Sequence, residues 1–147
     1  RLVRDLMRLC FLMEKRYAPY PKWFGAAFSK LNCAPTLSPL FRRALRAETW
    51  QEREEALSPA YEYVATLHNE LGITAPLPTQ VTSFHERPFK VIDFEGSFVR
   101  AIRDCIQDPV VKRIASGRLI GSLDQFSDST DTLSDERLRG TFRLLYE

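Results

Sequence analysis

Two prolines fix a corner between two helices in the segment Arg16–Phe24, which also holds four aromatic residues and two cations in nine positions. Apolar residues at helical spacing before this corner predict a helix over residues 1 to about 16: Leu2, Leu6, Leu9 and Met13. Pro19 and Pro21 end that helix, because a residue before proline avoids the α region. Pro21 can begin a second helix over 22 to about 31, since the first helical position needs no N–H. The corner is therefore expected to be a rigid wall of a site.

Further start and stop signals divide the middle of the chain into helices. Ser38-Pro39 predicts the start of a third helix, with serine as the N-cap and proline in the first position. Thr49 and Glu52 have the spacing of a capping box at the start of a long helix, and Gly72 is its expected end. Ser58-Pro59 predicts either a kink in that helix or a break and restart.

The second half begins irregularly and then becomes helical again. Prolines punctuate residues 73–95, where Phe89–Ile92 is expected to be extended. Helical spacing returns over 98–106 and 109–115, and acidic residues open a last helix near Ser134–Glu136. The sequence predicts one all-α domain over residues 1–147: an irregular helical bundle of about six or seven helices with a Pro-rich central loop.

The cysteines and the apolar runs limit where such a chain can work. Cys10, Cys33 and Cys105 are odd in number and form no C-x-x-C pair, which predicts reduced, buried thiols in a cytoplasmic protein. No apolar run approaches the ~20 residues that a membrane span needs, so we expect no membrane partner. The chain starts with Arg1 inside a helical pattern, so we expect a fragment of a longer protein.

Charge is divided unevenly along the chain. Residues 1–47 hold ten Lys and Arg against two acids, a net +8, whereas residues 48–147 hold eleven against seventeen, a net −6. A basic front third suits a nucleotide, a phosphate or an acidic partner domain. The alternative is a solvated basic face whose counter-charges lie on later helices.

No complete catalytic or metal-binding constellation is present. The loop Asp124–Asp131 fails as a calcium loop, because Phe126 stands at a ligand position and Ser129 where glycine is needed. Gly121-Ser122 followed by Asp124 evokes the metal motif of nucleotidyltransferases, yet its acids do not alternate on a strand. His68 is expected to be a core histidine. We therefore predict no catalytic residue, no metal ligand and no cofactor in this chain.

Binding residues are the remaining candidates. Arg16 and Lys22 flank the stiff corner with Tyr20 between them, and Arg87 precedes a proline that would hold it on a rigid turn. The alternatives are structural. Tyr17 and Tyr20 could staple the helix junction, and Arg87 could form a loop salt bridge. Three further aromatic residues are expected to fill the core: Trp23, Phe24 and Phe28.

Several blocks of the sequence together resemble the bacterial family catalogued as domain of unknown function 4037. They are Met7–Leu12, Arg16–Trp23, Trp50–Glu54, His68–Gly72, Arg87–Phe89 and Gly121–Phe126. The resemblance implies a two-part protein in which an N-terminal nucleotidyltransferase-like domain supplies metal-binding carboxylates, with any Mg²⁺ held there. This chain is similar to the C-terminal helical part alone. By analogy, Arg16, Lys22 and Asp124 would face the missing domain.

These observations lead to one expected function and one alternative. We expect a helical domain that is not an enzyme by itself, packs against its own N-terminal domain and supplies substrate contacts, with a nucleotide as the ligand. Arg16, Tyr20, Lys22, Arg87 and Asp124 are the predicted substrate-binding residues. The alternative is a helical protein–protein interaction module that binds no nucleotide. A nucleic acid is not an expected partner.

Overall fold

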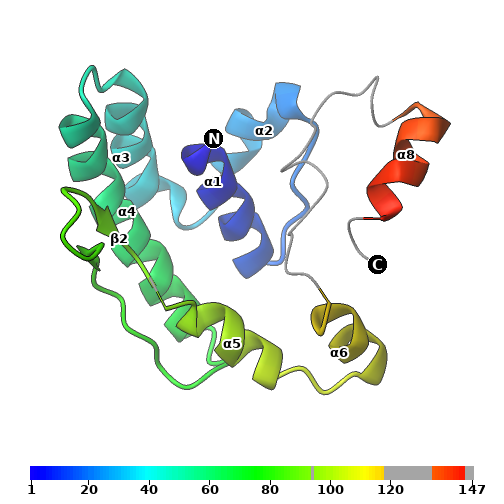
Figure 1. The fold of residues 1–147 in the computed structure, drawn as a ribbon. Helices are drawn as coiled ribbons and strands as arrows, with labels where there is room; N and C mark the ends of the chain where they lie inside the picture. Colours follow the sequence, from blue (N-terminus) through cyan, green and yellow to red (C-terminus); the bar gives the residue numbers. More distant parts are fainter. Residues whose placement is uncertain (94, 118–133, 145–147) are drawn as a thin grey trace. The chain divides into compact units, whose positions relative to one another are not determined.

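The computed structural model describes residues 1–93, 95–117 and 134–144, and these are helical apart from loops and one small sheet. They form seven helices and a two-stranded antiparallel sheet, which confirms the predicted all-α class (Figure 1). The chain divides into two compact units, Arg1–Ala101 and Ile102–Glu147. Each unit is described by itself, and the prediction of a single domain over 1–147 stays a prediction.

The first helix ends in a tight backbone cap that places Arg16. Helix α1 spans Leu2–Met13, so it ends about three residues earlier than predicted. Lys15 adopts a left-handed φ of 52° and donates its N–H to the Leu12 carbonyl at 3.0 Å. Arg16 donates its N–H to the Phe11 carbonyl at 2.8 Å. These two bonds are those of a Schellman motif, which turns the chain sharply out of the helix. Helix α2 then begins at Pro21 as predicted and spans Pro21–Phe28.

Helix α3 spans Ala34–Arg46, so the start predicted at Ser38-Pro39 is wrong. Pro35 occupies the first turn, where a backbone N–H has no acceptor within the helix, so its absence breaks no helical hydrogen bond. Pro39 lies inside the helix. No side chain of the described residues caps the first turn, and a distant residue binds the backbone just before it. The Glu14 carboxylate accepts the backbone N–H groups of Asn32 at 2.9 Å and Cys33 at 3.0 Å. Because that acceptor lies on another helix, no local spacing in the sequence could indicate it.

Helix α4 spans Trp50–Glu70 and has the predicted capping box. Glu52 donates its N–H to the Thr49 hydroxyl at 3.2 Å, and the Glu52 carboxylate accepts the Thr49 N–H at 3.3 Å. The helix is continuous through Pro59, so the alternative of a break and restart is wrong. Gly72 follows the helix with a φ of 63°, as its predicted role at the end requires.

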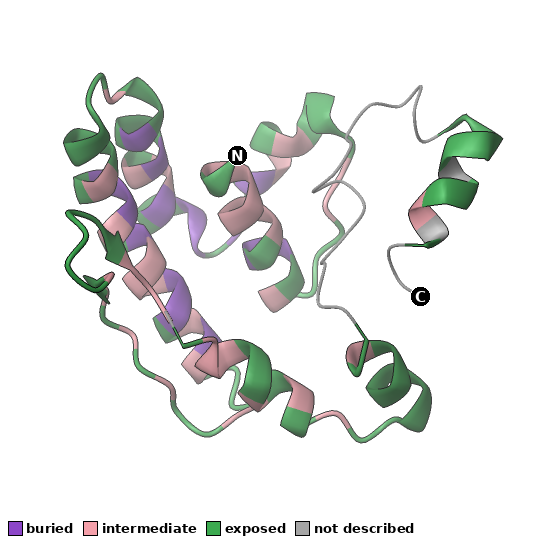
Figure 2. Ribbon diagram, viewed as in Figure 1, coloured by how far each residue is buried: buried purple, intermediate pink, exposed green. Residues whose placement is uncertain are grey.

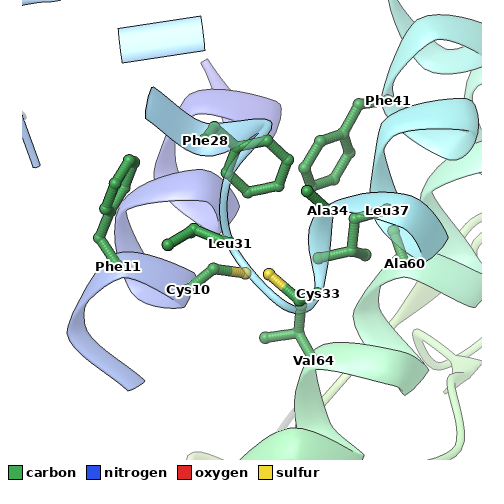
Figure 3. Close-up of a cluster of buried hydrophobic side chains, with 10 residues drawn as sticks. All are labelled: Cys10, Phe11, Phe28, Leu31, Cys33, Ala34, Leu37, Phe41, Ala60 and Val64. Atoms are coloured by element: carbon green, nitrogen blue, oxygen red, sulfur yellow. The ribbon is translucent and has the colours of Figure 1, made fainter. Parts of the chain in front are cut away.

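Helices α3 and α4 form an antiparallel hairpin, and α1 packs against both less extensively (Figure 1). Buried residues line the faces at which these helices meet (Figure 2). The ring centroid of Phe28 of α2 lies 5.6 Å from that of Phe41, with the rings tilted, and 6.4 Å from that of Phe11, with the rings edge to face. The main cluster comprises Cys10, Phe11, Phe28, Leu31, Cys33, Ala34, Leu37, Phe41, Ala60 and Val64 (Figure 3).

The irregular segment after α4 is tied back to that helix. The Asn69 side chain exchanges two hydrogen bonds with the Leu77 backbone, at 2.8 and 2.9 Å. Strand β1, Thr82–Ser83, pairs antiparallel with β2, Lys90–Val91, which confirms the predicted extended segment. Helix α5 spans Ser97–Asp104 and begins where the Asp93 carboxylate accepts the backbone N–H of Phe98 at 2.9 Å.

The second unit contains α6, Pro109–Ala115, and α8, Glu136–Arg143. Asp108 caps α6 by accepting two backbone N–H bonds, and Asp135 caps α8 in the same way. Cys105 is exposed, so the prediction that it is buried is wrong, whereas Cys10 and Cys33 are buried. Among the described helices, none combines the length and the apolar composition of a membrane span.

Candidate functional site

A groove of about 450 Å³ lies on the corner between α1 and α2. Its lining combines two cations, two exposed aromatic side chains and a small apolar floor, and we call it the corner groove. It is lined by Phe11, Arg16, Tyr17, Pro19, Trp23, Ala26, Ala27, Lys30 and Leu31. Phe11 and Leu31 are 2% and 5% exposed, so the floor belongs to the hydrophobic core. The groove therefore adjoins the main hydrophobic cluster of the first unit, which contains both residues.

Local sequence explains how the wall residues come together. The Schellman motif turns the chain so that Arg16 and Tyr17 follow α1 directly, and Pro19 restricts the backbone after them. Trp23, Ala27 and Lys30 follow one another at helical spacing along α2 and the turn after it. The groove is thus formed within one continuous stretch of the chain, residues 11–31, rather than by distant loops.

Trp23 is 61% exposed, so its predicted role as a core residue is wrong. Helix α2 is apolar around most of its circumference, and the buried side follows Phe28 and the half-buried Phe24. Trp23 lies one residue before Phe24, about 100° around the helix, and projects at the edge of that face. The Lys22 ammonium lies 5.6 Å from the centroid of the Trp23 ring, within the range of a cation–π contact.

The predicted binding residues do not all meet at the groove. Arg16 lines it, whereas Tyr20 and Lys22 are exposed on the same corner outside the lining. Arg87 lies between β1 and β2 and donates its backbone N–H to the Phe84 carbonyl at 3.0 Å. Asp124 lies outside the described residues. The structure thus brings together the corner residues alone.

Lys30 is a groove residue that the sequence analysis did not select. It follows Trp23 by seven positions and Ala27 by three, so helical spacing from Trp23 was the signal that could have found it. Within the described part of the chain, the side chains of Arg16 and Lys30 form no ion pair and no hydrogen bond. The Lys30 charge can therefore meet an anion in the groove, and Arg16, whose charge also interacts with the Glu14 carboxylate, lines the same groove.

Glu14 braces the corner and stays anionic. Partial burial by itself would raise the pKa of Glu14, but the N–H groups of Asn32 and Cys33, the Cys33 thiol and the Arg16 charge outweigh it. Its pKa is therefore held below the ordinary value. Glu14 ties the end of α1 to the start of α3, and the corner lies in the chain between these two points.

The described residues offer little other chemistry. Burial raises the pKa of the Cys10 thiol to about 11 and that of Cys33 further, so neither is a thiolate nucleophile near neutral pH. His68 is a satisfied core histidine, as predicted: its Nε2 lies 3.0 Å from the Thr74 hydroxyl, and its ring packs on Phe98. No cluster of three potential metal ligands occurs among the residues that the structure describes.

A second groove, of about 560 Å³, lies at the end of α3 and is lined by Pro39, Arg42, Arg43, Arg46, Ala47 and Glu52. Its charge is partly balanced, since Arg43 pairs with Glu55 at 3.6 Å and the Glu52 carboxylate is part of the lining. No aromatic side chain lines this groove. It is therefore a matched basic surface with which ligand binding at the corner groove can be compared.

Comparison with known proteins supports the resemblance in the corner region. The family described as Domain of unknown function (DUF4037) matches residues 1–24, which comprise α1, the Schellman turn and the first residues of α2. No curated protein and no solved structure matches the chain. The matched stretch contains Arg16, Tyr17, Pro19 and Trp23 of the corner groove.

Proposed function

We propose that this chain is a helical domain that binds a nucleotide substrate in the corner groove and works beside an N-terminal nucleotidyltransferase-like domain. The observation on which the proposal depends is the groove itself, in which two cations, Arg16 and Lys30, lie beside the exposed rings of Tyr17 and Trp23. Catalytic carboxylates and Mg²⁺ belong, in this proposal, to the other domain.

The chemistry of a nucleotide matches the chemistry of the wall. Tyr17 is 89% and Trp23 is 61% exposed, so both rings can stack on a base, a contact worth about 1–3 kcal/mol. Arg16 and Lys30 can hold phosphate oxygens by charge-assisted hydrogen bonds. The volume of about 450 Å³ lies within the range of small-molecule sites, roughly 300–1,000 Å³.

An exposed apolar stripe on α1 supports the part of the proposal that concerns another domain. Leu2, Leu9 and Leu12 are 53%, 43% and 74% exposed. Their spacing places them on one side of the helix, within about 80° of arc. Such a stripe is costly in water and is typical of a surface that packs against another protein surface. It adjoins the corner in sequence, so a domain packed on it would lie near the groove.

Nucleotide binding can be measured directly with Trp23 as the reporter. In a Trp50→Phe background, Trp23 is the single remaining tryptophan, and its fluorescence is expected to be quenched by ATP, GTP or CTP with Mg²⁺. Arg16→Ala and Lys30→Ala should each weaken binding about tenfold or more, because each removes a charge-assisted contact worth about 1.5–3 kcal/mol. Arg46→Ala, in the other basic groove, should leave the affinity unchanged.

Two outcomes would contradict the proposal. Equal weakening by Arg46→Ala and Arg16→Ala would show nonspecific attraction to a basic surface. No saturable quenching by any nucleoside triphosphate would favour the alternative, a protein–protein interaction module, for which the α1 stripe is the specific observation. In that case Leu12→Lys should abolish partner binding, whereas Lys30→Ala should not.

A further inference from the structure

Two buried cysteines face each other in the core behind the corner groove. Cys10 lies on α1 and Cys33 is the N-cap residue of α3; their exposed fractions are 0% and 1%. Their sulfur atoms point toward one another (Figure 3), and both side chains belong to the same buried cluster. Two thiols that face each other within one core have the starting orientation of a disulfide.

The chain between these two cysteines contains the whole corner. Every lining residue of the corner groove falls between Phe11 and Leu31, and the Glu14 brace falls there as well. A covalent bond from Cys10 to Cys33 would therefore close a loop around the groove and fasten both of its ends. The noncovalent brace at Glu14 acts on the same two points, the end of α1 and the start of α3.

We propose that Cys10 and Cys33 form a reversible disulfide that locks the corner, and that a small-molecule disulfide such as oxidised glutathione is the oxidant. One cysteine thiolate attacks the reagent's sulfur–sulfur bond, forms a mixed disulfide and releases one reduced thiol. The second cysteine then attacks the protein sulfur of that mixed disulfide and releases the other. The protein loses two protons and two electrons, and the reagent gains them as two thiols.

Opening of α1 controls the rate of this exchange. Both sulfurs are buried and protonated in the closed structure, so reagent meets thiolate only when α1 moves away from α3. We expect α1 to be the helix that moves, because it packs less extensively on α3 and α4 than these two helices pack on each other. Exposed Cys105, in the second unit, provides an internal comparison, since it can react without any opening.

The test refolds the whole chain in the presence of reduced and oxidised glutathione, which removes burial as a kinetic barrier. A Cys105→Ser background prevents pairing with the exposed thiol. After free thiols are blocked with a maleimide, the expected product is two hydrogens lighter and carries no glutathione. Its proteolytic map should contain a Cys10–Cys33 cross-link. Its urea midpoint should exceed that of the dithiol form, and amide exchange over residues 11–32 should slow.

The inference is overturned if the native refolded protein keeps both thiols free at every glutathione ratio that oxidises a solvent-exposed dithiol peptide. Persistent mixed disulfides at Cys10 or Cys33 without internal closure would overturn it too. No Cys10 or Cys33 variant is needed, so a misfolded mutant cannot confuse the result. The measurement uses no nucleotide, so its outcome is independent of the proposed binding function.

Discussion

Removal of the Glu14 carboxylate should destabilise the first unit by more than its half-buried position suggests. The side chain accepts the N–H groups of Asn32 at 2.9 Å and Cys33 at 3.0 Å, just before α3. Hydrogen bonds to a charged acceptor contribute about 1.5–3 kcal/mol each when shielded. Asn32 is exposed, so water replaces that bond cheaply, and Cys33 is buried. We expect a loss of about 2–3 kcal/mol for Glu14→Ala, and about 1–2 kcal/mol for Glu14→Gln, which keeps one acceptor.

The loss at Glu14 should depend on pH with a defined sign. The pKa of Glu14 is lower in the folded chain than its ordinary value of 4.5. The unfolded chain therefore takes up the proton first as the pH falls, and the stabilisation is complete above pH 4.5. It disappears as the pH falls through the lower, folded pKa. The difference in unfolding free energy between wild type and Glu14→Gln should therefore stay constant from pH 7 to near pH 4.5 and shrink at more acidic pH.

Urea unfolding followed by far-ultraviolet circular dichroism measures this difference across the pH range. Glu55→Gln is the matched control. Its partner Arg43 lies 3.6 Å away in a pair that is 61% and 70% exposed, so it should change stability by no more than about 0.5 kcal/mol. Equal effects of Glu14→Gln and Glu55→Gln at pH 7 would refute the brace. A Glu14→Gln effect that stays constant down to pH 3 would refute its electrostatic origin.

Four further substitutions test the fold, each by the same urea titration. Lys15→Gly should stabilise by about 0.5–1 kcal/mol, because Lys15 holds a φ of 52° that glycine adopts without strain; a loss would contradict the Schellman turn. Thr49→Ala should cost about 1 kcal/mol, because Thr49 caps α4; no change would mean that the cap is dispensable. Phe28→Ala should cost about 3–5 kcal/mol, whereas Trp23→Ala, at 61% exposure, should cost under about 1 kcal/mol. Similar losses for these two would place Trp23 in the core.

Start signals that act within a few residues were predictable from the sequence. Pro21 at the start of α2, Thr49 with Glu52 at the start of α4, and Asp108 before α6 all depend on neighbours within one turn. The start of α3 was not predictable, because the N–H groups just before it, those of Asn32 and Cys33, are bound by Glu14, 18 and 19 residues earlier in the chain. Ser38-Pro39 offered a local alternative that this tertiary contact overrides.

The candidate site shows the same division between local and distant information. The rigid corner and Arg16 followed from the prolines and the end of the helical pattern. The burial of Trp23 was predicted wrongly because α2 is apolar on nearly every side, so helical spacing could not fix which face meets the core. That face is decided by the rings of Phe11 and Phe41, which come from other helices.

The Glu14 brace joins the two ends of the segment that forms the corner groove, so loss of the brace is expected to affect the affinity of the groove for its ligand. The apparent affinity of a ligand that binds only the closed corner is its intrinsic affinity multiplied by the fraction of molecules in which the corner is closed. Loss of Glu14 would weaken binding only if that fraction falls well below one, whereas loss of Arg16 removes a contact in the closed state itself. The apparent affinity of Glu14→Gln should therefore recover when Cys10 and Cys33 are joined, because the disulfide restores closure. The affinity of Arg16→Ala should not recover, since no closure replaces the missing charge.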